Sequence, residues 1–440
     1  MKSLKVGRYA NTSLIQVLKA FIVSLLLIFI LAGCYDAKEI DELTYVLAIG
    51  VDKGVADTYR LTVKFHTMKE AGGGGAGGKG GGGGGMAGGE HEIITIDALS
   101  FFTGINMINA AVPRKLNFMH AKFLVFSEEI AKTGVGEFIA PIIRFREIRR
   151  TLHVIVARGK ASDFLAEYEP VVGTTLSKAM ELVVAEPANI GFFAHITLND
   201  FYNGLKSTYR QPTAILGGIN KFENFREDGP TVPDTGNMKK KEYYAGEIPR
   251  KGGSKIEFYG TAVFNGDKMV GELTGEETRL MNILTGKFRR GFFTIEDPKA
   301  PPLIVPLDVR EQRAPDIKVK LIDGKPYINV VIRLEGDILA VQSRLNYEED
   351  PLKTLLQDSF IKQIKNEMNT LIERCQKMDS DIFRFGRIVS SKFYTLQEWQ
   401  NFNWIKKFKD AEVNIDMDFA IRRTGTLLKS SPILTTEEAK

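Results

Sequence analysis

Apolar and polar positions in the first part of the chain predict strands that alternate with helices. A continuous apolar run at 45–51 predicts a buried strand, and residues 59–65 alternate as its half-buried partner in a hairpin. Further strands are predicted at 92–96, 121–126 and 151–157. Because strands that alternate with helices favour a mixed sheet, we assign residues 34–211 to an N-terminal mixed α/β domain.

Helix signals lie between these strands. Asp97 is placed to cap a helix over about 98–111, and Ser127 to cap a short helix that follows it directly. Two more helices are predicted over about 134–147 and over 161–167. We expect these helices to pack on the sheet.

Turn and capping signals dominate the next part of the chain. Asn265-Gly266-Asp267 separates two apolar segments and predicts a β-hairpin, and Asp323-Gly324 predicts a second one. Thr274 and Glu277 have the spacing of a capping box, which predicts a helix that ends near Gly286. Strands followed by helices favour an α+β arrangement in this half.

Apolar residues recur at three- and four-residue steps from Leu352 to Cys375 and predict one long amphipathic helix. Since Cys375 belongs to this stripe, we predict a buried and unreactive thiol. Residues 381–404 are predicted to be largely helical, and residues 411–421 to form a last strand. We assign 212–430 to a C-terminal α+β region, either undivided or split into subdomains at about 212–310 and 311–430, and 431–440 to a tail.

Residues 71–89 are almost entirely glycine. Glycine loses more backbone entropy on ordering than other residues and has no side chain to bury, so we expect a disordered loop. The tract matches phosphate-binding patterns by composition, but Gly80 stands where a P-loop carries Ser or Thr, and no strand-loop-helix context surrounds it. We therefore interpret it as a flexible insertion in the N-terminal domain.

The N-terminus has the pattern of a lipoprotein signal. Basic residues precede an apolar run at 20–32, which is shorter than the roughly 20 residues of a membrane-spanning helix. The run ends in the lipobox Leu31-Ala32-Gly33-Cys34. We expect cleavage between Gly33 and Cys34, which removes 1–33, and acylation of the Cys34 sulfur and of the new amine. The alternative is an uncleaved anchor helix, which also leaves the chain outside the cytoplasm and against a membrane.

Charge and cysteine content change this picture little. The formal net charge is +5, but four basic residues lie in the signal, which leaves the mature chain near +1. This balance gives no reason to expect a nucleic-acid partner. Of the two cysteines, Cys34 takes the lipid, so Cys375 has no partner for an intramolecular disulfide.

The sequence lacks the residue spacings typical of catalytic and metal-binding sites. The five histidines show no HxH or HExxH spacing, and the chain has no CxxC and no GxSxG elbow. His120 and His153 lie beside or within predicted strands and are interpreted as structural. We predict a protein that is not an enzyme, with no catalytic residues, no metal and no cofactor other than the lipid on Cys34.

Four arginines form the densest basic patch of the chain, namely Arg144, Arg146, Arg149 and Arg150. One interpretation is a solvated or salt-bridged helix end. The other is a docking surface for an acidic partner or for anionic lipid headgroups.

A set of short segments extends over nearly the whole mature chain after the lipobox. They are Glu39-Ile40-Asp41-Glu42-Leu43, Val46-Leu47-Ala48-Ile49-Gly50-Val51-Asp52, Phe118-Met119-His120-Ala121-Lys122, Arg144 with Glu147-Ile148-Arg149-Arg150, Ala157-Arg158-Gly159-Lys160-Ala161, Gly260-Thr261-Ala262-Val263-Phe264 and Asp381-Ile382-Phe383-Arg384-Phe385-Gly386. In this order they resemble the spore germination Ger(x)C family, the C-subunit lipoproteins of germinant receptors. Tyr35 stands where the family often has Trp, and the glycine tract resembles no usual part of the family.

This resemblance implies several mixed α/β domains with no known catalytic residues. It implies a lipoprotein, with the lipid on Cys34, on the outer face of the cell membrane or spore inner membrane. The implied partners are the membrane and the integral-membrane A- and B-type receptor subunits, with which the protein helps convert nutrient sensing into germination. The family motifs are mainly structural, so no ligand-binding residue is carried over.

Two other classes of anchored protein stay open. A solute-binding lipoprotein of a transporter would have a longer tether after the lipidated cysteine and two repeated lobes around a cleft, and the sequence shows neither. An anchored hydrolase would need a nucleophile or metal signature that we do not find.

Overall fold

The computed structural model describes residues 16–25, 39–56, 58–67, 91–171, 175–227, 243–423 and 430. The predicted lipobox and the glycine tract lie outside these described residues. The chain divides into two compact units, Met1–Thr44 and Tyr45–Lys440. In the first unit, residues 16–25 are helical and Ile40–Glu42 form a 3₁₀ turn, η1. Among the described residues, every helix is too short or too polar to cross a membrane.

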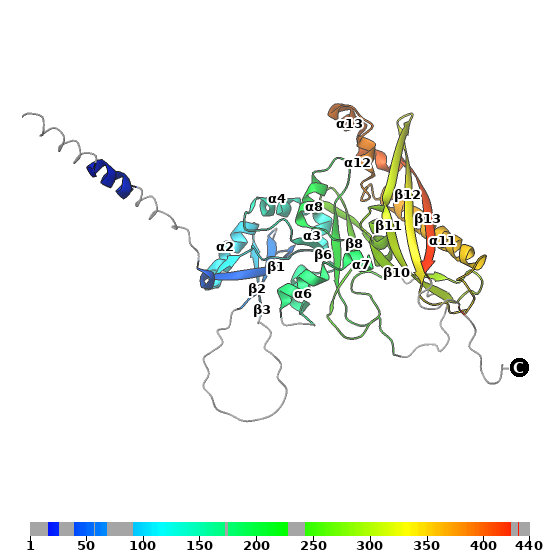
Figure 1. The fold of residues 1–440 in the computed structure, drawn as a ribbon. Coiled ribbons are helices and arrows are strands. Elements are labelled where there is room, and N and C mark those ends of the chain that lie inside the picture. Colours follow the sequence, from blue (N-terminus) through cyan, green and yellow to red (C-terminus); the bar gives the residue numbers. More distant parts are fainter. Residues whose placement is uncertain are drawn as a thin grey trace, which may run out of the picture. The chain divides into compact units, whose positions relative to one another are not determined.

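A nine-stranded mixed sheet organises much of the second unit (Figure 1). Its order is β3-β2-β1-β5-β6-β7-β8-β9, with β4 also paired to β1. The strands are β1 (Leu43–Lys53), β2 (Tyr59–His66), β3 (His91–Ala98), β4 (Lys115–Asn117), β5 (Phe123–Ser127), β6 (His153–Ala157), β7 (Thr213–Ile219), β8 (Ile256–Asn265) and β9 (Lys268–Leu273). The central strands β1, β5, β6 and β7 are parallel, and antiparallel pairs flank them on both sides. Because β5 and β6 are buried at every position, they lack the polar alternation of a half-exposed strand.

Short helices connect the strands of this sheet. They are α2 (Phe101–Ala111), α3 (Glu128–Thr133), α4 (Gly136–Arg144), α5 (Ala161–Glu167), α6 (Leu176–Val183), α7 (Pro187–Ile190) and α8 (Leu198–Leu205). The predicted Ser127 cap is confirmed, since its hydroxyl accepts a hydrogen bond from Ile130 N at 3.3 Å. The predicted Asp97 cap is wrong. Asp97 still lies in β3 opposite Arg60 and pairs with it at 2.8 Å, so Ser100 caps α2 instead.

A second sheet has the order β10-β11-β12-β13. Its strands are β10 (Arg290–Glu296), β11 (Ile304–Ile322), β12 (Lys325–Ile338) and β13 (Glu412–Arg423). The long amphipathic helix is confirmed as α11 (Leu352–Lys377), which runs along this sheet and packs on β13 (Figure 1). Phe360 of α11 stacks on Phe419 of β13 with a centroid distance of 4.1 Å. This contact fixes which face of the helix is buried.

Local signals in the second half are largely confirmed. The turn at Gly266 joins β8 to β9, and Gly266 adopts the positive φ of 62° that such a turn requires. Thr274 and Glu277 form the capping box of α10 (Gly275–Leu284). The predicted helical stretch at 381–404 is instead broken into α12 (Phe385–Ser390), α13 (Leu396–Phe402) and the start of α14 (Trp404–Lys407), which precedes η2 (Phe408–Asp410). The mixed α/β and α+β fold class is confirmed.

The predicted domain boundary at 211/212 stays a prediction. The first sheet continues beyond it to Leu273, because β7, β8 and β9 add to the edge formed by β6. Antiparallel pairing therefore extends a single sheet across that point of the chain.

Cys375 lies in the buried stripe of α11 and is 0 % exposed, and burial raises the pKa of its thiol well above the usual range. We expect thiol reagents to label Cys375 only after denaturation. Cys375→Ala should lower the free energy of unfolding by about 1–2 kcal/mol through a small cavity. Labelling followed by mass spectrometry, with and without urea, checks this; rapid labelling of the native protein would contradict the assigned burial.

Candidate functional site

The predicted lipidation site, Cys34, and its neighbour Gly33 lie outside the described residues. Both remain predictions.

The arginine patch has a different backbone from the one expected. Helix α4 ends at Arg144, so the predicted helix over 134–147 is too long, and the other three arginines lie in an irregular segment. The helix ends there because Phe145 turns to an extended conformation and packs its ring against Phe102 and Phe118, with centroids 5.5 and 5.8 Å away. The next inward side chain is Ile148, which is buried.

These inward contacts leave the arginines outside. All four are exposed: Arg144, Arg146, Arg149 and Arg150. None of them forms an ion pair within 4 Å with another residue in the described part of the chain. The structure thus places the patch on the surface, with its charges turned to solvent.

A buried carboxylate organises the segment after α11. Asp381 is 2 % exposed and lacks an ion-pair partner among the described residues. Its oxygens accept hydrogen bonds from backbone N–H groups of Phe383 (3.0 Å), Phe385 (3.3 Å) and Gly386 (2.9 Å), and from Trp404 Nε1 at 2.9 Å. Burial raises the pKa of Asp381 to about 6, which the four donors oppose by stabilising the carboxylate.

The backbone around Asp381 is tied to the first sheet. Gln211 N donates to the carbonyl of Asp381 at 2.8 Å, and Ser380 Oγ donates to the carbonyl of Phe264, on β8, at 2.7 Å. Three residues after Asp381, Arg384 adopts a left-handed conformation with φ +68°. The side chain of Arg384 is thereby aimed at α8 and the end of α10.

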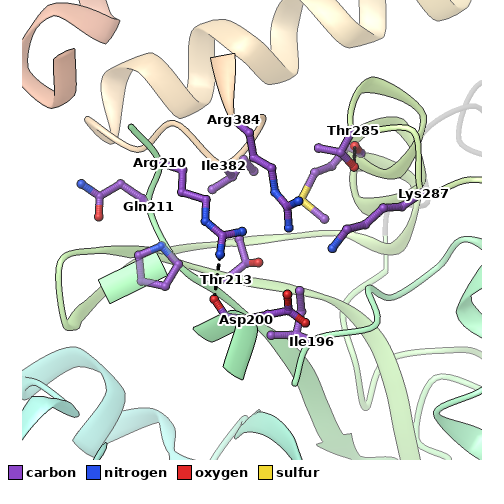
Figure 2. Close-up of a pocket in the computed structure, with 11 residues that line it drawn as sticks. Ile196, Asp200, Arg210, Gln211, Thr213, Thr285, Lys287, Ile382 and Arg384 are labelled. Atoms are coloured by element: carbon purple, nitrogen blue, oxygen red, sulfur yellow. Dashed lines mark hydrogen bonds between the residues drawn. The ribbon is translucent and has the colours of Figure 1, made fainter. Parts of the chain in front are cut away.

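Three cations converge there on one cavity (Figure 2). Arg210 precedes β7, Lys287 follows α10, and Arg384 precedes α12; Figure 2 shows their side chains pointing into a common space above Asp200. Asp200 lies in α8, where its carboxylate completes the capping box of Thr197. The cavity offers about 20 Å³ to the centre of a water molecule.

The electrostatics of this cavity are strongly positive. Burial, reinforced by the nearby Arg384, lowers the pKa of Lys287 to about 8. Burial and Arg384 also lower the pKa of Arg210. Burial pushes the pKa of Asp200 upward, but the hydrogen bonds from Thr197 together with the charges of Lys287 and Arg384 hold the pKa of the carboxyl below its ordinary value. Lys287 and Arg210 therefore each carry a desolvation cost that Asp200 offsets only in part.

A larger hollow, with about 420 Å³ open to water centres, lies at the carboxyl ends of β1, β5 and β6. Parallel sheets often bind ligands at this edge. Here, however, Lys53 pairs with Glu129 at 3.2 Å, and Lys132 pairs with Glu128. Asp52 accepts hydrogen bonds from the N–H groups that begin α5, at 2.7 and 2.9 Å. Most charged groups that line this hollow therefore already have an ion-pair or hydrogen-bond partner within the protein.

Within the described ranges, no three His, Cys, Asp or Glu side chains gather as a metal site would require. His153 is buried in β6, with the ring of His195 4.7 Å away. Burial and His195 lower the pKa of His153 to about 4, so the ring stays neutral at physiological pH. This environment suits the structural interpretation of His153.

Sequence reasoning missed the cation cavity. Its four charged residues come from separate parts of the chain, and no spacing links them. The only available signal was Arg384, which lies in the segment 381–386 that we singled out for family resemblance.

Comparison with known proteins identifies the family. The family model described as "Spore germination protein N-terminal domain" matches residues 36–220. The family model described as "Spore germination B3/GerAC like, C-terminal" matches residues 259–425. The chain belongs to the GerAC-like spore germination family. The resemblance inferred from short segments is thereby confirmed.

Full-length relatives support this assignment. Spore germination protein KC of Bacillus subtilis (strain 168) is 24% identical, over 94% of this chain and 96% of its own. The putative spore germination protein YfkR of the same strain is 23% identical, over 93% of this chain and 97% of its own. Among solved structures, the crystal structure of the GerBC protein matches with a TM-score of 0.46 and 16% identity, over 85% of this chain and 96% of that chain.

Asp381→Ala should lower the free energy of unfolding by about 3 kcal/mol or more, because it leaves several buried donors without an acceptor. Asp381→Asn keeps one acceptor oxygen, so its free energy of unfolding should lie between that of Asp381→Ala and that of the wild type. Urea unfolding measures both, with Asp358→Ala on the exposed face of α11 as a control expected to be neutral. Equal unfolding midpoints for Asp381→Ala and the wild type would show that the carboxylate is dispensable.

Proposed function

We propose that the chain is a lipid-anchored subunit of a spore germinant receptor, needed for the response to nutrient germinants. The observation that carries the proposal is the ordered match of two germination family models over 36–220 and 259–425. Relatives that carry germination names align over almost their whole length, which supports a shared role for the complete chain. The family match gives no support to the alternative, a solute-binding lipoprotein of a transporter.

The proposed mode of action is assembly rather than catalysis. In this proposal, lipid on Cys34 holds the folded region against the outer face of the cell membrane or spore inner membrane. Integral-membrane A- and B-type receptor subunits are the proposed partners.

The exposed arginines are the proposed contact for an acidic surface of such a partner, or for anionic headgroups. Four cations displayed on a segment that Phe145 and Ile148 hold in place form a positioned patch rather than a loose tail. A positioned patch of one sign favours oriented association.

The anchor can be tested with Cys34→Ser in a spore-forming host. Without the sulfur, neither lipidation nor cleavage should occur, and the protein should stay about 3 kDa heavier because roughly 33 residues are retained. Immunoblots of membrane fractions and a nutrient germination assay measure size, location and function. Normal processing and full membrane retention of the mature-size variant would exclude the lipobox.

The patch can be tested by charge reversal, with Arg146→Glu combined with Arg150→Glu. Complex recovery from spore membranes should fall in a salt-sensitive way, while the melting temperature of the purified protein stays within about 1 °C of wild type. Arg146→Lys with Arg150→Lys keeps the charge and should assemble normally.

Lys406→Glu with Lys409→Glu makes the same charge change at another exposed site and serves as the matched control. If the reversed arginine variant assembles like the wild type, the patch is only a solvated surface. If it unfolds, the arginines belong to the internal framework instead.

A further inference from the structure

The cation cavity beside Asp200 contains donors without acceptors. Arg210 Nη2 donates to the carbonyl of Asp200 at 3.0 Å, but Arg210 Nε is buried and has no hydrogen-bond partner. The side chains of Lys287 and Arg384 form no hydrogen bond, and no ion pair within 4 Å, with any residue that the structure describes. Three cationic groups therefore face the cavity with unused donors.

Nearby carboxylates neutralise these cations only in part. Asp200 Oδ2 accepts hydrogen bonds from the hydroxyl and the N–H of Thr197, at 2.8 and 3.3 Å. Asp381, the other acid close by, is fully engaged by its own donors. The half-buried cluster thus has an excess of positive charge, which is costly in a site with restricted access to water.

The size of the cavity limits what can neutralise it. The space open to a water centre is only about 20 Å³, so the cavity admits a small particle and not a bulky ligand. A water molecule would satisfy donors but would leave the charge unchanged. We propose that the cavity binds one monatomic inorganic anion of chloride size, held by Arg210, Lys287 and Arg384.

Such an anion would connect both family-matched regions. Asp200 and Arg210 lie within the region matched over 36–220, whereas Lys287 and Arg384 lie within that matched over 259–425. Bound chloride stabilises the contact between these segments by cancelling their mutual repulsion. Occupancy of the site is independent of the proposed receptor function.

The first test measures the melting temperature of the full chain in detergent at constant ionic strength, with chloride or gluconate as the anion. Gluconate is too large for the cavity. Chloride should raise the wild-type melting temperature by about 2–4 °C at concentrations well above its Kd. Lys287→Met should lose this increment, and in gluconate it should melt at or above the wild type, because the variant lacks one of three repelling charges.

Lys362→Met on the exposed face of α11 is the matched control and should keep the full chloride increment. A wild type with equal melting temperatures in both salts overturns the proposal. So does a Lys287→Met variant that keeps the wild-type increment.

The pH dependence of chloride affinity gives a second test, because it would not change with the protonation of Lys287 if the role of that residue were purely structural. The charged groups facing Lys287 are Asp200 of α8, Arg210 before β7 and Arg384 before α12. Because Lys287 begins to lose its proton near pH 8, chloride affinity should fall up to tenfold per pH unit above that point. A pH-independent chloride affinity contradicts the role of Lys287.

A crystal of the wild-type chain soaked in bromide gives a test that needs no variant. An anomalous peak inside the cavity, within hydrogen-bonding distance of the Lys287 amine, supports the site. A cavity that holds only water at saturating bromide overturns it.

Discussion

The buried carboxylate of Asp381 fixes the backbone of the segment that follows α11. Three backbone N–H groups and one indole N–H converge on its two oxygens, at distances of 2.9 to 3.3 Å. Because no cation pairs with it among the described residues, the stability of this buried charge depends wholly on those donors. This single group therefore determines the path of residues 381–386, the start of α12 and the position of Trp404.

That path has an electrostatic consequence. By holding Phe383 and Phe385 on either side, Asp381 leaves Arg384 in a left-handed conformation with its guanidinium directed toward Arg210 and Lys287. The same acid that stabilises the segment thus brings a third cation to a cavity where, among the described residues that line it, Asp200 is the one carboxylate. The backbone contacts of Asp381 therefore also produce the excess of positive charge in the cavity.

The two groups of arginines and lysines illustrate opposite solutions to positive charge. The patch at 144–150 keeps its charges exposed, while Phe145 and Ile148 provide the packing energy that fixes the segment. The cavity instead removes its cations partly from water, which lowers the pKa of Lys287 to about 8. The exposed group suits long-range attraction to a surface, whereas the enclosed group suits contact with a single ion.

Signals that act within a few residues of the chain were sufficient for much of the secondary structure. The hairpin at Gly266, the Thr274 capping box and the stripe of α11 all follow from local turn chemistry, side-chain hydrogen bonds and helical periodicity. The ordered family segments likewise determined the family. Where a local signal competed with a long-range contact, the tertiary structure determined the outcome. Asp97, for example, pairs with Arg60 across β2 and β3 instead of capping a helix. The tertiary structure alone brought Asp200, Arg210, Lys287 and Arg384 together, because their meeting depends on sheet order and on the Asp381 contacts, which join residues distant in sequence.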